Sequence, residues 1–233
     1  MVDIRDIKIF IDPGHGGPEE RPDVSGSQLG TPGYYGHFAP SDGYYEKDAN
    51  LEISLKLESL LQAENVTYMM SRRDDIAVSL MNRVHMANDF GADIFISIHN
   101  NAINDPDIGG TMVLFPGRSD ISKQLAVVMS REISNRLNTR DIGAIERNDL
   151  VVLRETKMTA VLVEAVFMTN LEEYEMLQEP ETQWLIAEAI IASVKIHIQQ
   201  FPGIYERPIT RRALPGLVAI GALGTIAYFS LRN

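Results

Sequence analysis

Two kinds of hydrophobic pattern alternate along this chain. Short runs in which almost every residue is apolar are typical of strands buried in a sheet, and longer segments with apolar residues at every third or fourth position are typical of amphipathic helices. Their alternation predicts an α/β fold, with a twisted, mostly parallel or mixed central sheet flanked by helices on both faces. We expect strands within residues 7–12, 66–71, 92–102, 109–117 and 159–170, and helices within 50–64, 79–91, 119–137 and 180–201.

The last part of the chain has a different pattern. Residues 213–231 carry no charge over nineteen positions, and as a helix they would span roughly 28 Å, close to the hydrocarbon thickness of a bilayer. A proline-containing stretch at 202–212 separates them from the preceding helix. We therefore expect a globular domain at 1–201, a linker at 202–212 and an apolar C-terminal tail at 213–233 that forms a transmembrane helix. A helix docked on the globular domain is the alternative.

Composition narrows the classes of function. The formal net charge of −11 opposes binding to a polyanion, so we expect no nucleic acid partner. The chain has no cysteine, which excludes disulfides, thiolate zinc sites and cysteine nucleophiles. Charges interrupt the first ten residues throughout, with no basic segment followed by a long apolar stretch. We therefore expect no cleavable signal peptide.

Candidate chemistry gathers where the predicted strands end, because loops at that edge of an α/β sheet are held by a rigid scaffold. His15 follows the first strand among glycines, His99 ends the third, and Glu164 lies at the far end of the strand near Val161. Glu46 stands just ahead of the first helix. Two imidazoles and a carboxylate can fill three corners of a tetrahedral Zn²⁺ site, leave the fourth for water, and let a further carboxylate take the proton of that water.

The other three histidines are interpreted as ordinary hydrogen-bonded surface residues. A single histidine near a loop is more often such a residue than a metal ligand. His85 and His197 fall within predicted helices, and His37 falls within a loop.

Four blocks of sequence resemble a known family: IDPGHGG, YYEKDANLEIS, SRRDDIAVSLMNRVHMANDFGADIFISIHNNA and VLVEAVFMTN. In order and spacing they are similar to the zinc-dependent N-acetylmuramoyl-L-alanine amidases of the amidase-3 type, over residues 5–200. The resemblance implies one Zn²⁺ ion held by His15, Glu46 and His99, with Glu164 as the catalytic glutamate. It also implies an α/β sheet with flanking helices and makes 1–201 an amidase catalytic domain.

The chain departs from the family pattern at three places. Between His15 and Glu46 stand 30 residues, where members often have a short Gly-rich connection. This Gly- and Tyr-rich insertion is either a substrate-contacting loop or an ordinary surface insertion. The block at Glu164 reads Glu-Ala-Val-Phe instead of Glu-any-Gly-Phe, and Thr159 stands where a proline is frequent. These changes affect backbone packing more than the reacting groups.

Polar residues next to the expected zinc ligands carry further hypotheses. Asp12 either orients the imidazole of the first histidine ligand, fixing which nitrogen faces the zinc, or forms the turn. Asn100 and Asn101 follow the second histidine ligand, where they orient it, bind substrate or pack at the strand end. Arg72 and Arg73 are interpreted as forming a structural ion pair with Asp74 or Asp75 in preference to binding a stem-peptide carboxylate.

The resemblance implies a peptidoglycan hydrolase that cleaves the amide bond between N-acetylmuramic acid and L-alanine. Zn²⁺ lowers the pKa of a bound water to roughly 7 and polarises the scissile carbonyl, and Glu164 moves the proton from that water to the leaving amine. A zinc-dependent peptidoglycan endopeptidase would use the same metal chemistry and stays open as an alternative. A non-catalytic wall-binding module is disfavoured because all four site residues are present.

The expected substrate lies outside the cytoplasmic membrane, although no export signal is visible. A bacteriophage endolysin, or a lytic enzyme released from a mother cell, likewise accumulates inside the cell and acts on the wall once a membrane fails. Arg207, Arg211 and Arg212 precede the apolar tail and Arg232 follows it. The positive-inside tendency therefore predicts membrane association through 213–231, with the catalytic domain at first on the cytoplasmic side.

Overall fold

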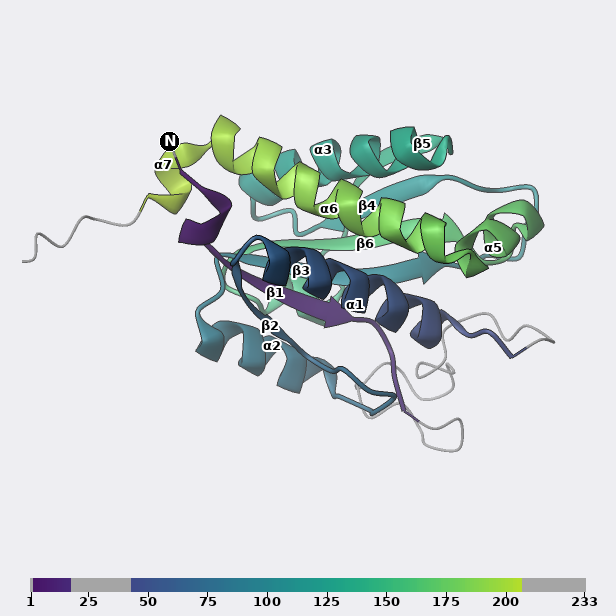
Figure 1. Ribbon diagram of the computed structural model, residues 1–233, viewed down its shortest axis with the longest axis horizontal. Helices are drawn as coiled ribbons and strands as arrows, with labels where there is room; N and C mark the ends of the chain where they lie inside the picture. The colour runs from purple at the N-terminus through teal and green to yellow at the C-terminus, as the bar shows by residue number, and fades with distance from the viewer. Residues whose placement is uncertain (1, 18–42, 207–233) are drawn as a thin grey trace, which may run out of the picture.

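Six strands form one mixed sheet in the computed structural model, which describes residues 2–17 and 43–206. The strands are β1 Lys8–Pro13, β2 Thr67–Met70, β3 Ile94–Asn101, β4 Thr111–Phe115, β5 Asp141–Glu146 and β6 Thr159–Phe167. They lie in the order β2-β1-β3-β6-β4-β5 (Figure 1). The strands β2, β1, β3 and β6 are parallel, β4 is antiparallel to β6, and β5 is parallel to β4. The expected central sheet is thus confirmed in its mixed form.

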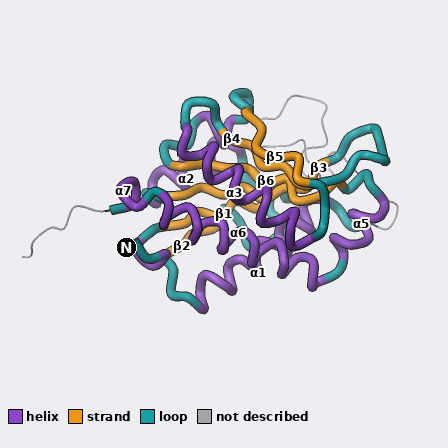
Figure 2. The backbone as a smooth tube through the Cα atoms, turned by 90° about the horizontal axis from the view of Figure 1, so that it is seen from above, coloured by secondary structure: helices purple, strands orange, loops and turns teal. Residues whose placement is uncertain are grey.

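Helices cover both faces of this sheet. They are α1 Glu46–Ala63, α2 Leu80–Phe90, α3 Asp120–Leu137, α4 Val151–Arg154, α5 Leu171–Gln178, α6 Pro180–Gln200 and α7 Pro202–Tyr205, with a 3₁₀ turn, η1, at Ile4–Asp6. The larger hydrophobic core lies between the sheet and α1, α3 and α6, and the smaller one between the sheet and α2 and α4. Figure 2 shows the strands in the middle, with helices around them.

The two cores explain why the strands are apolar at nearly every position. Side chains alternate between faces along a strand, so Ile9 and Ile11 enter the larger core while Phe10 enters the smaller one. There the ring of Phe10 stacks on that of Phe95 at 5.7 Å between centroids. Because water reaches neither face, a continuous apolar run is the expected pattern for such strands.

All five expected strands and four expected helices are present. The sequence did not predict β5, α4, α5 or α7. Helix α1 begins at Glu46 instead of Asn50, because the Tyr45 backbone N–H donates to the Asp48 carboxylate at 3.3 Å and caps an earlier turn. Glu46 is therefore the first residue of the helix.

The C-terminal part of the described chain folds back onto the domain. Helix α7 packs against α6, and the Tyr205 hydroxyl lies 3.0 Å from Nε2 of His197 and donates to the Thr159 hydroxyl at 3.3 Å. The interpretation of His197 as a surface residue is therefore wrong, since its side chain is fully buried. His85 is exposed on α2, and His37 lies outside the described residues.

Within residues 2–17 and 43–206, no helix has both the length and the apolar character needed to cross a bilayer. The expected transmembrane segment at 213–233 lies outside the described residues. So do most of the expected linker and residues 18–42 of the insertion.

Candidate metal centre and catalytic site

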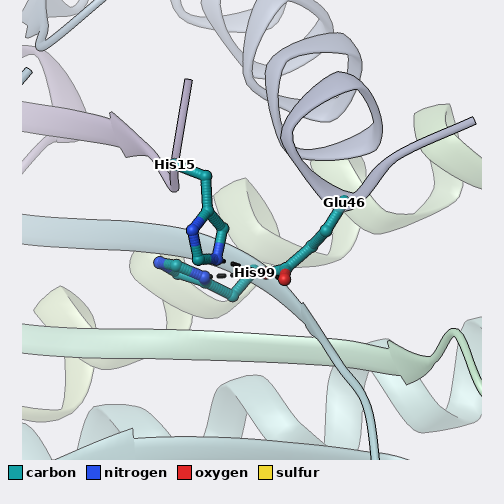
Figure 3. Close-up of side chains that lie close together, drawn as sticks. All are labelled: His15, Glu46 and His99. Atoms are coloured by element: carbon teal, nitrogen blue, oxygen red, sulfur yellow. Dashed lines mark hydrogen bonds and ion pairs between the residues drawn. The ribbon is translucent and has the colours of Figure 1, made fainter. Parts of the chain in front are cut away.

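Three side chains from separate elements converge at the carboxyl end of the parallel strands (Figure 3). His15 lies in the turn after β1, Glu46 opens α1, and His99 belongs to β3. Nε2 of His15 lies 3.1 Å from one carboxylate oxygen of Glu46, and Nδ1 of His99 lies 2.8 Å from the other. One ligand atom from each residue lies within 4.8 Å of the others. The structure thus brings together the three residues named as zinc ligands.

Glycines allow this close approach. A Cβ atom on Gly14 would lie 2.3 Å from the imidazole of His99, so any side chain there would push the ring away. His15 itself has a φ of 57°, a left-handed conformation that is uncommon for a residue with a side chain. Gly16 and Gly17 follow with φ values of 113° and 106°, which glycine adopts at little cost. The strained turn aims the first imidazole back across the end of the sheet.

The electrostatics favour the ligand forms of Glu46 and His99. Burial opposes ionisation of Glu46, but the adjacent imidazoles and their hydrogen bonds outweigh it and hold the pKa of Glu46 below its usual value. For His99, burial is the larger effect and lowers the pKa despite the neighbouring carboxylate. Metal ligation requires a deprotonated carboxylate and neutral imidazoles. This set of two partly buried nitrogen donors and one buried carboxylate therefore fits Zn²⁺.

Glu164 lies beside this cluster on the neighbouring strand. It is the register partner of His99 across the β3–β6 ladder, so both side chains leave the sheet on the same face. Its Oε2 is buried and has no hydrogen-bond partner within the described part of the chain. Burial and the nearby charge of Glu46 raise the pKa of Glu164 well above its usual value. An unpartnered carboxylate that protonates readily is suited to proton transfer.

An apolar recess of about 150 Å³ opens beside the two imidazoles. Its walls include Leu80 at the start of α2, Leu150 and Val151 at the start of α4, and Leu162 on β6. Leu162 points to the same side of β6 as Glu164, two residues further along. A substrate group entering the recess would therefore lie next to the candidate reacting centre.

Of the two asparagines that follow His99, only Asn100 contacts the cluster. The backbone N–H of Asn100 donates to Glu46 at 3.3 Å, and its side-chain amide donates to Asn50 at 3.0 Å. Asn50, which the sequence did not single out, in turn donates to Glu46 at 3.3 Å. Asn101 instead donates to the Met112 sulfur at 3.7 Å and accepts a hydrogen bond from the next backbone N–H. Asn100 thus holds the Glu46 carboxylate in place, and Asn101 packs at the strand end.

Asp12 shapes the turn through an arginine. Its carboxylate accepts hydrogen bonds from the hydroxyls of Ser71 and Ser97, at 2.6 and 2.9 Å, and from Arg83 at 2.7 Å. Arg83 also donates to the backbone carbonyl of His15 at 2.6 Å. Of the two roles considered for Asp12, these contacts correspond to forming the turn.

The expected pairing of Arg72 and Arg73 with Asp74 or Asp75 is wrong. Arg73 points outward and pairs with Glu58 at 2.7 Å. Arg72 points inward under the turn after β1 and donates to backbone carbonyls. Asp75 pairs instead with Lys47 of α1 at 2.6 Å. The chain turns between the two arginines, so neighbours in sequence have different partners.

A sequence model of the family described as N-acetylmuramoyl-L-alanine amidase matches residues 9–196. The chain belongs to the N-acetylmuramoyl-L-alanine amidase family. The match contains His15, Glu46, His99 and Glu164, and it leaves out the apolar tail.

Named relatives agree with this family. The chain is 36% identical over 174 residues to the N-acetylmuramoyl-L-alanine amidase CwlM of Bacillus licheniformis, covering 74% of this chain and 61% of that protein. It is 32% identical over 184 residues to the amidase LytC of Bacillus subtilis, covering 78% of this chain and 34% of LytC. The chain therefore spans less than two thirds of the length of these two relatives.

Solved structures of the family share the fold. An N-acetylmuramoyl-L-alanine amidase from Clostridium difficile 630 superposes with a TM-score of 0.73 at 31% identity, covering 84% of this chain and 99% of that one. The amidase AmiC2 of Nostoc punctiforme superposes with a TM-score of 0.71 at 30% identity, covering 83% of this chain and 98% of that one. The described fold thus extends over nearly the whole of both of these solved chains.

Proposed function

We propose that this domain hydrolyses the amide bond between N-acetylmuramic acid and L-alanine in peptidoglycan, with one Zn²⁺ ion held by His15, Glu46 and His99. The observation that supports it most is the convergence of these three side chains beside Glu164, in a chain of the N-acetylmuramoyl-L-alanine amidase family. Zn²⁺ in such a site would act as a Lewis acid and lower the pKa of a bound water to roughly 7.

Glu164 carries the proton in this proposal. Its free Oε2 accepts a proton from the attacking water as the water oxygen bonds to the scissile carbonyl carbon. It then delivers that proton to the amine nitrogen of L-alanine as the C–N bond breaks. The raised pKa of Glu164 makes its carboxylate a stronger base than an ordinary glutamate, which favours uptake of the water proton. Such a group contributes typically 10²–10⁴-fold to the rate.

The surrounding residues keep the reacting groups in place. Asn50 and the Asn100 backbone hold the Glu46 carboxylate toward the imidazoles, and Arg83 holds the backbone of His15. Leu150 and Val151 form part of an apolar wall beside the imidazoles, and apolar surroundings strengthen electrostatic interactions.

Mass spectrometry of digested peptidoglycan tests the proposed bond. Free lactyl carboxyl groups on muramic acid, together with new L-alanine amino termini, are the expected products. Ends at D-alanine would show the endopeptidase alternative instead. The variant Glu164→Ala should keep its zinc and lose lysis. Full lysis by that variant would remove Glu164 from the mechanism, and no lysis by the wild-type protein would favour a wall-binding module.

We further propose that residues 213–231 hold the enzyme at the membrane until the wall becomes accessible. The proposal is supported by the uncharged length of this segment. Fractionation of cells expressing the protein with and without residues 213–233 tests it. We expect the full chain in the membrane fraction and the truncated chain in the soluble fraction, and a soluble full-length chain would refute the proposal.

A further inference from the structure

Arg72 is a buried arginine whose hydrogen bonds within the described part of the chain all run to the backbone. It follows β2 and its side chain is only 2% exposed. Its guanidinium donates to four carbonyl oxygens, of Pro13 at 3.0 Å, Gly14 at 2.8 Å, Lys47 at 2.7 Å and Asp74 at 3.2 Å. Among residues 2–17 and 43–206, no carboxylate lies within ion-pair distance of it, in contrast to Arg83 with Asp12.

Burying the Arg72 charge without a paired carboxylate is energetically unfavourable. Burial, reinforced by the charge of Arg83, lowers the pKa of Arg72 to about 10, which shows that the folded protein disfavours the charge there. A buried cation without a paired anion has to be stabilised by hydrogen bonds. The fixed planar fork of the guanidinium fits several acceptors at once, which an ammonium group does not.

The carbonyls that Arg72 binds belong to the two segments that carry the metal ligands. The carbonyls of Pro13 and Gly14 directly precede His15, and the carbonyl of Lys47 directly follows Glu46. A single nitrogen, Nη2, donates to both Gly14 and Lys47. Arg72 therefore joins the turn after β1 to the first turn of α1 at the point where the two ligands meet.

The turn leaves space for this side chain. A Cβ atom on Gly16 would lie 2.8 Å from Nε of Arg72, so a side chain at that position would displace the guanidinium. Asn50 adds a weaker connection between the same segments, donating to Gly14 at 3.4 Å and to Glu46 at 3.3 Å. Arg83 differs, because its hydrogen bonds stay with residues 12–15 and Val78 and do not reach α1.

We propose that Arg72 is a positioning residue that sets the separation of His15 and Glu46 and thereby the affinity of the site for Zn²⁺. The inference rests on the proposed function, because it requires that these residues hold zinc. Loss of a group that orients metal ligands typically weakens metal affinity by roughly 10–100-fold. Arg72→Gln removes the charge and most of the fork, and should show a loss in that range.

The test is the zinc dissociation constant, measured by competition with a fluorescent chelator on the full chain. Arg72→Gln and Arg72→Lys are compared with wild type, and Arg73→Gln is the matched control. Arg73 is adjacent, half-exposed and paired with Glu58, so its replacement makes the same charge change without touching the site. Arg72→Lys keeps the charge but cannot reproduce the fork, so we expect a loss of about 10-fold. It also serves as the test if the glutamine variant does not fold.

Melting temperatures of the zinc-free proteins separate positioning from general stability. A lower melting temperature with zinc affinity within about threefold of wild type would make Arg72 merely structural and overturn the inference. An equal loss of affinity in Arg73→Gln would also overturn it, by indicating a general charge effect. If the wild-type protein itself does not bind zinc, the proposed function fails and the inference fails with it.

Discussion

Two histidine environments in this protein, one partly buried at His99 and one fully buried at His197, have opposite chemical character. His99 lies at the carboxyl end of β3 against the Glu46 carboxylate and beside the apolar recess. His197 lies inside α6, with its ring 5.1 Å from that of Phe201 and 5.8 Å from that of Tyr205. Burial lowers the pKa of both. Burial of an imidazole therefore does not by itself make a site.

The difference lies in the groups that surround each imidazole ring. At His99 a carboxylate and a second imidazole share one small space, and the backbone of His15 is strained to bring them there. At His197 one nitrogen meets the Tyr205 hydroxyl, and the other, Nδ1, is buried without a hydrogen-bond partner in the described chain. A convergent anion and a strained turn mark the first region as functional, while apolar packing marks the second as structural.

The largest expected effect follows from replacing His99, the histidine of the candidate metal centre. His99→Ala should abolish zinc binding and lower peptidoglycan hydrolysis by more than the roughly 100-fold typical of losing a group that only orients a ligand. His197→Gln should leave zinc content and hydrolysis within a few-fold of wild type. Metal analysis after dialysis and a dye-release assay on purified cell walls measure both. A zinc-loaded, active His99→Ala protein would contradict the assignment of His99.

The stability of the fold is expected to depend on pH through His197. Burial lowers the pKa of His197 to about 4, whereas the unfolded chain titrates near 6.5. Below pH 6.5 the unfolded state binds a proton that the folded state refuses, so stability falls as the pH drops from about 6.5 toward 4 and is unaffected above that window. The loss amounts to roughly 3 kcal/mol.

Urea unfolding of wild type and His197→Gln between pH 7 and pH 4.5, with a chelator present, measures this contribution. The variant does not titrate at this position, so the stability difference between the two proteins should change with pH. A difference that stays constant over the window would show that His197 is not the buried titrating group.

The smallest expected effect concerns the space available for an added methyl group at Gly14 and at Gly203. In Gly14→Ala the new methyl group collides with the His99 ring, which should cost about 1–3 kcal/mol of stability and weaken zinc binding. A methyl group added to Gly203 of α7 would meet no atom within 4 Å, so Gly203→Ala should be neutral or stabilising by about 0.4–1 kcal/mol. Urea unfolding and zinc titration measure the pair. Equal stabilities for the two variants would mean that Gly14 is not required by the imidazole.

Much of the fold follows from hydrophobic pattern, and the exceptions have physical causes. Strands buried on both faces are apolar throughout, so β1, β3 and β6 stand out in the sequence. Strand β5 lies at the sheet edge, has Ile145 38% exposed and a positive φ at Gly143, and therefore lacks an apolar run. The antiparallel direction of β4 is set by pairing with β6, which no local pattern encodes.

The same reasoning separates the predictable from the unpredictable residues of the site. His15, Glu46 and His99 could be named from the sequence because imidazoles and a carboxylate at strand and helix ends have a recognisable chemistry. Arg72 was assigned the wrong partners and Arg83 was not singled out, because backbone carbonyls accept many of their hydrogen bonds. A carbonyl is present at every residue, so the sequence does not reveal which ones an arginine will bind.

The docking of Tyr205 onto Thr159 fixes the position of Glu206, the last described residue. Thr159 begins β6, and Glu164 lies five residues later, which is about 17 Å along a strand. In Figure 1, the β1 arrow points to the right, and α7 lies at the left. A segment continuing from Glu206 therefore starts at the opposite end of the sheet from the catalytic groups. An anchor or fusion partner attached at Glu206 would therefore sit at the end of the sheet opposite the candidate metal centre.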